Sequence, residues 1–163
     1  MTGEIMDERL FEEFYPRIYN YIYYRVRHKE NAEDLTSDTF FKAVANKARY
    51  DAKKSSYSTW IFTIARNNVT DFFRRNKNEQ ALDDSIEAAD GELDEGLVAL
   101  DDIKNLMAVL AQLNDREREI LALRYWGGFS YKEIAGQLGL SVNNVGSIIN
   151  RSVVKLRKLW HNI

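Results

Sequence analysis

Residues 130–159 read SYKEIAGQLGLSVNNVGSIINRSVVKLRKL, and this stretch decides the fold of the C-terminal part of the chain. Ser130 and Glu133 have the spacing of a capping box, in which each side chain accepts a backbone amide at the start of a helix. Gly139 permits the positive φ of a tight turn, and Ser141 can cap a second helix. The stretch therefore predicts a helix-turn-helix, in which the first turns of the second helix face the major groove of DNA. An ordinary helical hairpin is the alternative.

Further helices are expected upstream of this motif. Apolar residues recur at helical spacing over residues 97–113. Asn114 or Asp115 can cap the next helix, which ends at Gly127.

The N-terminal part of the chain is expected to be helical as well. Apolar residues recur at steps of three and four from Leu10 to Val26, with Pro16 inside the pattern. Because proline removes a backbone donor, either a second helix begins at Pro16 or the helix kinks there. Asn31 can cap the next helix, which runs to about Asn46.

The helix over residues 31–46 has two different faces. Its apolar face is expected to consist of Leu35, Thr39, Phe40, Ala43 and Val44. Asp34 and Asp38 lie four residues apart on another face, where they repel each other weakly. These acids indicate either a solvated face or a docking face for a basic partner.

A basic loop over residues 46–58 precedes a long helix over residues 58–76. The basic side chains around Tyr50 in this loop are Lys47, Arg49, Lys53 and Lys54. Ser55, Ser56 or Ser58 can cap the helix. Its buried side is expected to consist of Trp60, Ile61, Ile64, Ala65, Val69, Phe72 and Phe73.

The opposite side of this helix carries a stripe of hydrogen-bonding side chains without an acid. The stripe consists of Thr59, Thr63, Arg66, Asn67, Thr70 and Arg74. A solvated helix face normally includes glutamates, whereas hydroxyl, amide and guanidinium groups bind phosphates and base edges. Tyr50, Tyr57 and Trp60 add rings on which unpaired bases can stack. Alternatively, Tyr57 and Trp60 belong to the core; Trp60 is expected to be at least partly core, and Tyr50, in the loop, is the better candidate for stacking.

Composition favours an all-α fold with an uneven distribution of charge. The 163 residues are 45% hydrophobic and include one proline and eight glycines, so chain breakers are few. The net charge of −2 by itself argues against a nucleic-acid binder. By segment, however, residues 38–76 and 103–163 each carry a net charge of +5, whereas residues 77–102 carry −9. The small total therefore hides two basic blocks and an acidic one.

These blocks predict two small helical domains, residues 1–76 and 97–163, joined by an acidic linker over residues 77–96. The absence of cysteine excludes thiol catalysis and cysteine-ligated metal sites, and the two histidines are far apart in the sequence, so no metal site is expected. No apolar run approaches the roughly 18 residues that a membrane span needs, and the N-terminus lacks the features of a signal peptide. We therefore expect a soluble cytoplasmic protein without membrane insertion.

Three stretches carry a resemblance to a known family: residues 32–43 (AEDLTSDTFFKA), 57–75 (YSTWIFTIARNNVTDFFRR) and 113–159, which begins LNDREREILALRYWGG. In this order they resemble the second and fourth regions of bacterial sigma factors of the extracytoplasmic function type, group 4 of the sigma-70 family. The resemblance implies a non-enzymatic initiation factor, without a cofactor, that joins core RNA polymerase and directs it to promoter DNA.

The resemblance also implies roles for individual residues. Docking on the beta-prime subunit of the polymerase is implied for Asp34, Leu35, Asp38 and Phe40. Contacts with the minus ten element are implied for Tyr50, Lys53, Lys54, Trp60, Thr63, Arg66, Asn67, Thr70 and Arg74. Contacts with the minus thirty-five element are implied for Ser130, Tyr131, Lys132, Ser141, Val142, Asn143, Asn144, Ser147, Asn150, Arg151 and Lys155. The beta subunit and an anti-sigma protein are further partners that the family implies.

Two alternatives stay open. Many relatives have basic residues early in the last helix, where this chain has Gly146 and Ile148, so we expect weak or unusual recognition of the minus thirty-five element. Alternatively, Gly146 lets the backbone approach DNA closely. The alternative function is a stand-alone helix-turn-helix regulator with an N-terminal dimerisation or effector module, which leaves the basic loop and the polar stripe of residues 46–75 without a role.

Overall fold

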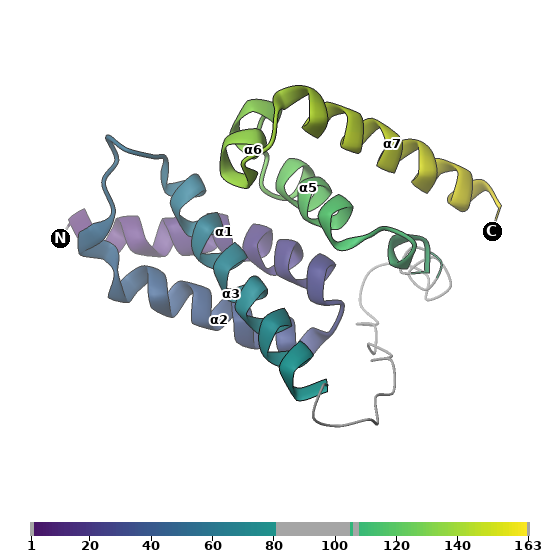
Figure 1. Cartoon of the computed structure of the whole chain (residues 1–163). Helices are drawn as coiled ribbons and strands as arrows, with labels where there is room; N and C mark the ends of the chain where they lie inside the picture. The colour runs from purple at the N-terminus through teal and green to yellow at the C-terminus, as the bar shows by residue number, and fades with distance from the viewer. Residues whose placement is uncertain (1, 81–104, 106–107, 163) are drawn as a thin grey trace. The chain divides into compact units, whose positions relative to one another are not determined.

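The computed structural model describes residues 2–80, 105 and 108–162, and all regular structure in these ranges is helical (Figure 1). The all-helical fold is therefore confirmed. The described residues fall into two units, here called unit one (α1 to α3) and unit two (α5 to α7). Residues 77–80 of the predicted linker belong to α3, whereas its remaining residues, 81–96, and most of the helix predicted over residues 97–113 lie outside the described residues.

Unit one is a bundle of three helices, α1 (Thr2–Val26), α2 (Lys29–Ala45) and α3 (Tyr57–Gln80), each of which packs against the other two (Figure 1). Its largest fully buried side chains are Tyr21, Phe62, Ile18, Ile22 and Ile61. Full burial of such a side chain contributes about 1.5–3 kcal/mol, so these apolar faces hold the bundle together. α3 continues four residues beyond residue 76, where its end was predicted.

The start of α2 corrects one prediction. α1 is a single helix that includes Pro16, and the chain turns at Arg27, which has a φ of 54°. The cap of α2 is His28, whose Nδ1 accepts the backbone amide of Asn31 at 3.3 Å. The prediction that Asn31 is the cap was therefore wrong, because the turn at Arg27 lets the helix begin earlier.

The connection between α2 and α3 is short and locally hydrogen-bonded. A single 3₁₀ turn, η1 (Lys47–Arg49), follows α2. The carboxylate of Asp51 then accepts the backbone amide of Lys53 at 2.9 Å. Ser56 caps α3, because its hydroxyl accepts the backbone amide of Thr59 at 3.2 Å. The structure thus selects Ser56 among the three predicted serines.

Unit two contains α5 (Asp115–Tyr125), α6 (Tyr131–Leu138) and α7 (Val142–His161), preceded by a helical turn at residues 108–111. Asn114 caps α5 and forms a capping box with Glu117. The predicted capping box that begins α6 is present, and its two hydrogen bonds measure 2.7 and 3.2 Å.

The geometry of α6 and α7 confirms the predicted helix-turn-helix. Gly139 ends α6 with a φ of 65°, and the Ser141 hydroxyl accepts the backbone amide of Asn144 at 3.1 Å. The core beneath the two helices includes the buried side chains of Ile120, Leu123, Ile134, Ala135, Val145 and Ile149. A Cβ at Gly127 would lie 2.6 Å from the carbonyl oxygen of Leu123, so the turn after α5 requires glycine.

No helix among the described residues is both long enough and apolar enough to cross a membrane. Within the same ranges, no three histidine, cysteine or acidic side chains are grouped so that they could hold a metal ion.

Candidate nucleic-acid and protein interfaces

The polar stripe of α3 is partly open to solvent. Asn67, Thr70 and Arg74 are exposed, whereas Thr63 and Arg66 are half-buried. The hydroxyls of Thr63 and Thr70 donate to backbone carbonyls one turn earlier, at 2.7 and 2.9 Å. Toward a ligand these two hydroxyls can therefore only accept a hydrogen bond. Asn67 is therefore the member of the stripe best placed to donate to a base edge and accept from it.

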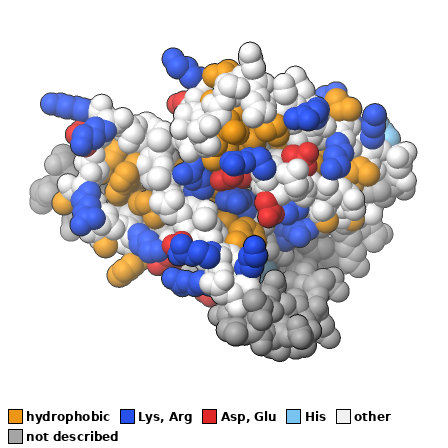
Figure 2. All heavy atoms as spheres, in the orientation of Figure 1, with side chains coloured by type: hydrophobic (Ala, Val, Ile, Leu, Met, Phe, Trp, Pro, Cys, Tyr) orange, Lys and Arg blue, Asp and Glu red, His pale blue; other side chains and the backbone are white. Residues whose placement is uncertain are grey.

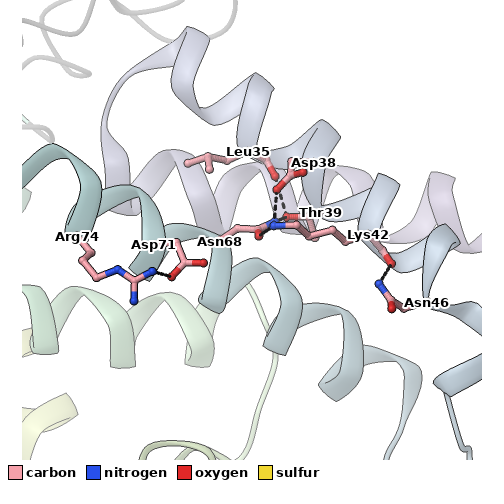
Figure 3. A network of polar contacts seen from close by, with 8 residues as sticks. All are labelled: Leu35, Asp38, Thr39, Lys42, Asn46, Asn68, Asp71 and Arg74. Atoms are coloured by element: carbon pink, nitrogen blue, oxygen red, sulfur yellow. Dashed lines mark hydrogen bonds and ion pairs between the residues drawn. The ribbon is translucent and has the colours of Figure 1, made fainter.

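Arg74 forms an ion pair with Asp71 at 2.9 Å, and both side chains are substantially exposed (Figure 3). Exposed ion pairs of this kind contribute about 0–1 kcal/mol, so a phosphate can replace Asp71 as the partner of Arg74 at little cost.

Three aromatic side chains form a cluster where the basic loop meets α3. The ring centroid of Tyr50 lies 5.7 Å from that of Tyr57 and 5.2 Å from that of Trp60. All three side chains are half-buried, as expected for Trp60, while Lys53 and Lys54 are exposed on the adjoining loop. These aromatic rings and lysines are close to one another in the sequence, and rings beside cations are suited to binding single-stranded nucleic acid.

These rings line one side of a hollow of about 350 Å³ in unit one. The other walls come from α1 and α2, and the lining includes Leu10, Phe11, Phe40, Phe41, Val44 and Lys47. Figure 2 shows hydrophobic side chains exposed among Lys and Arg side chains on the visible face of the molecule. Sequence reasoning missed the walls from α1 and α2, because they reach the loop only through tertiary packing.

The candidate docking face of α2 requires a correction. Asp34 is exposed, and Leu35 and Asp38 are half-buried, but Phe40 is only 9% exposed and packs on Phe11 with centroids 4.9 Å apart. Phe40 therefore belongs to the interior of the bundle and is not available for docking. Its neighbour Phe41 is 73% exposed.

The expected apolar face of α2 also differs from the buried one. Val44 is 69% exposed, and the buried residues are Ala32, Thr36, Thr39, Phe40 and Ala43. The two threonines can be buried because their hydroxyls donate to carbonyl oxygens of the same helix, at 2.6 and 2.7 Å.

A polar network connects this face of α2 to α3 (Figure 3). The Lys42 ammonium lies 2.8 Å from the Asp38 carboxylate and donates to the side-chain oxygen of Asn68. The Asn68 amide in turn donates to the Thr39 hydroxyl at 3.0 Å, and the Asn68 residue is 4% exposed. Asn68, which the sequence did not single out, is thus a buried polar residue with its amide satisfied from both sides.

The helix-turn-helix presents most of its candidate residues to solvent. The exposed members of the predicted set are Ser130, Lys132, Ser141, Val142, Asn143, Asn144, Ser147, Asn150, Arg151 and Lys155. Tyr131 is half-buried, and the Arg124 guanidinium lies 5.3 Å from its ring centroid. A Cβ built on Gly146 would lie 3.5 Å from the same ring, so Gly146 faces α6.

Lys155 is exposed and also makes contacts within unit two. Its ammonium donates to the carbonyl oxygen of Gln112 at 2.7 Å and lies 3.9 Å from the Glu117 carboxylate. It therefore anchors α7 to the segment before α5, because an ammonium satisfies carbonyl groups left open where a helix ends. Because the Lys155 side chain is 45% exposed, its contact with DNA stays a prediction.

Comparison with protein families matches both units. Residues 10–79 match the model of sigma-70 region 2, and residues 103–156 match that of sigma-70 region 4. The match over residues 10–79 also speaks against the alternative in which this part is only a dimerisation or effector module.

Individual relatives agree with the family models. The chain is 31% identical to the RNA polymerase sigma factor YlaC of Bacillus subtilis over 160 residues, covering 93% of this chain and 90% of YlaC. It is 32% identical to the ECF RNA polymerase sigma factor BldN of Streptomyces coelicolor, covering 93% of this chain and 59% of BldN. Among solved structures, the sigma factor RpoE in complex with the anti-sigma factor NepR, from Bartonella quintana, superposes with a TM-score of 0.77 at 26% identity, covering 93% of this chain and 94% of RpoE.

The chain matches the two region models in order, and it matches one relative over nine-tenths of that relative's length. Both findings agree with the two helical units and their exposed polar faces. The chain belongs to the sigma-70 family, as a sigma factor of the extracytoplasmic function group, a non-catalytic subunit that directs RNA polymerase to initiate transcription at specific promoters.

Proposed function

We propose that the two units of this sigma factor divide promoter recognition between them. Unit one contacts the minus ten element as it melts, unit two binds the minus thirty-five element, and the acidic segment over residues 77–96 connects them. One observation carries this division: each unit exposes a helix face rich in amide and hydroxyl side chains. On α3 this face is the stripe around Asn67, and on α7 it includes Asn143 and Ser147. The carboxylate of Asp71, beside the α3 stripe, is paired with Arg74.

In unit one, the aromatic cluster of Tyr50, Tyr57 and Trp60 is the proposed site for a base extruded from the minus ten element. Extrusion costs a few kcal/mol of stacking and pairing, which contact with aromatic side chains offsets. The exposed Lys53 and Lys54 are placed on the adjoining loop, where they can hold the flanking phosphates.

Core polymerase is proposed to dock on α2 through its beta-prime subunit. The proposed contact set is Asp34, Leu35, Asp38 and Phe41, with Phe41 in place of the buried Phe40. Asp34 carries the largest share of the electrostatic contact, because the charge of Asp38 is partly balanced by Lys42.

Two further partners and a location follow from the family. We propose contacts with the beta subunit of the polymerase, and an anti-sigma factor as regulator, since the similar RpoE structure contains the anti-sigma factor NepR. The cytoplasm is the proposed location, because promoter DNA and polymerase are found there.

Reversing the charge of α2 tests the docking face. Gel filtration with core polymerase compares two double variants of the full chain. One carries Asp34→Lys and Asp38→Lys on α2, and the control carries Glu8→Lys and Glu12→Lys on α1, which is the same change of charge. All four positions are at least partly exposed. We expect about tenfold weaker binding for the α2 variant alone. Equal binding by both variants would refute the docking face.

Asn67→Ala tests the role of the α3 stripe in melting. Transcription by reconstituted holoenzyme and permanganate footprinting of unpaired thymines are compared with binding to core polymerase. We expect open complexes to decrease about tenfold with binding to core unchanged, and the control Asn20→Ala on α1 to change neither. Loss of both activities in Asn67→Ala would mean that the residue is structural.

A further inference from the structure

The first three turns of α7 present a face of unusual chemistry for a helix that enters the major groove. Asn143, Ser147 and Asn150 lie at spacings of four and three on one exposed stripe, and Asn144 is exposed beside it. Arg151 is the only Lys or Arg among residues 142–151. This outer face therefore consists of amides and a hydroxyl, with a single cation at its far end.

The rotation of α7 that gives this face is fixed from three sides. Val145 and Ile149 are buried in the core of unit two. The Ser141 hydroxyl holds the first turn, and Gly146 lies against the Tyr131 ring. The stripe cannot turn inward without breaking these contacts, so it is the side that α7 offers to DNA.

The chemistry of this stripe selects among base pairs. The amide of asparagine matches the N7 acceptor and N6 donor of adenine, whereas guanine is read chiefly by arginine or lysine. Val142, which is 46% exposed at the first helical position, adds a methyl surface of the kind that contacts the methyl group of thymine. The first two turns thus offer contacts to A·T pairs and lack the cation that most often reads guanine.

We propose that α7 reads an upstream promoter element rich in A·T pairs, with Asn143 and Asn150 as the adenine-reading residues. The reading rests on the minus thirty-five role proposed above for unit two. Seven residues of helix span about 10 Å at ~1.5 Å per residue, so the two adenines are expected roughly three base-pair steps apart at ~3.4 Å per step. Lys132 and Arg151 supply phosphate contacts, which position the helix without specifying sequence.

Selection from a promoter library tests this reading. Holoenzyme reconstituted from the full chain and core polymerase transcribes templates with randomised upstream DNA, each identified by a barcode in the transcribed part. We expect the transcribed templates to be enriched in A·T pairs upstream, with adenine at two fixed positions. Guanine at those positions, or transcription without any upstream base preference, would overturn the reading and leave the sigma activity intact. If the holoenzyme transcribed no template at all, the proposed function would fail together with it.

Substitutions of Asn143 assign the reading to a residue. Asn143→Ala is expected to lower the preference for adenine at one position roughly tenfold and to leave the other positions unchanged. Asn143→Arg is expected to change that preference from adenine to guanine. Asn162→Ala, at the exposed C-terminal end of the same helix, is the control and is expected to change nothing. A uniform decrease over all templates in Asn143→Ala, with helicity retained by circular dichroism, would contradict a base-reading role.

Discussion

Replacement of Gly146 by alanine separates two explanations for a glycine inside the recognition helix. If the glycine lets the backbone approach DNA, a methyl group there obstructs binding. In the structure, however, the new Cβ would lie 3.5 and 3.6 Å from two atoms of the Tyr131 ring, which is ordinary van der Waals contact. Gly146→Ala is therefore expected to leave DNA binding unchanged and to stabilise unit two.

The size of the effect follows from helix propensity. Glycine in a helix interior costs about 0.5–1 kcal/mol relative to alanine, and the contact with Tyr131 adds to this gain, so we expect about 1 kcal/mol. Two other glycines calibrate the measurement. A Cβ on Gly136, within α6, would have nothing within 4 Å, so Gly136→Ala is expected to gain only the propensity. Gly139→Ala is expected to lose about 1–2 kcal/mol, because Gly139 has a φ of 65°.

Urea denaturation followed by fluorescence measures these changes in unit two. The chain has three tryptophans, and a Trp60→Phe background leaves only Trp126 and Trp160, both in unit two. With a slope of about 1 kcal/mol per molar urea for a domain of this size, the midpoint for Gly146→Ala is expected to rise by about 1 M. A lower midpoint would show that the space beside Tyr131 is too tight for a methyl group. Weaker promoter binding at a raised midpoint would instead support close approach of the backbone to DNA.

The remaining predictions concern single polar contacts. Ser130→Ala is expected to cost about 1 kcal/mol of stability in the same assay. Hydrogen bonds from the backbone and hydroxyl of Ser130 hold the pKa of Glu133 below its ordinary value of 4.5. The stability that the charged Glu133 contributes is therefore present at neutral pH and is lost as the pH falls through the lowered pKa. Glu133→Gln is expected to reduce this loss of stability in acid. Asn68→Ala is expected to destabilise unit one by about 1–3 kcal/mol, measured by the thermal midpoint of its α-helical signal, since it removes a buried amide that bonds on two sides. Lys155→Met is expected to lower stability, and a decrease in DNA affinity with a smaller salt slope would confirm that Lys155 also contacts a phosphate.

Local signals in the sequence predicted unit two well, because the interactions that define it span only a few residues. The capping box of Ser130 and Glu133, the left-handed Gly139 and the cap at Ser141 are all present as predicted. Each depends on backbone groups within four residues along the chain, so the residue types and their spacing suffice to recognise it.

Faces of α2 were harder to predict, because the choice between neighbouring residues depends on packing. Phe40 and Phe41 are equally apolar, yet one is 9% and the other 73% exposed. Thr36 and Thr39 can occupy the buried side because their hydroxyls donate to carbonyl oxygens of the same helix, and Thr39 also accepts from Asn68 of α3. The expected face included Thr39 but not Thr36, and it was therefore rotated toward the exposed Val44.

Contacts between distant residues could not be predicted at all. Lys42 and Asn68 are 26 residues apart, and Lys155 and Gln112 are 43 apart. In α3 the adjacent Asn67 and Asn68 differ by about 100° around the helix, so one is exposed and the other is buried. The sequence shows two asparagines of equal chemistry, and only the packing of α2 on α3 decides which of them can reach DNA.

From the distribution of charge along the chain we expect binding to DNA to depend on the polymerase. Residues 38–76 and 103–163 carry +5 each, whereas the −9 of residues 77–102 is tethered between them. Because the Debye length is about 10 Å at 0.1 M salt, we expect tethered acids to compete with DNA phosphates for Lys and Arg side chains at low salt. The first turns of α7 add little compensation, because Arg151 is their only cation. We therefore expect binding of the free chain to DNA to be weak, and stable promoter binding to need the additional contacts that docking on the polymerase provides. A comparison of promoter affinity at low salt between the free chain and the holoenzyme checks this expectation.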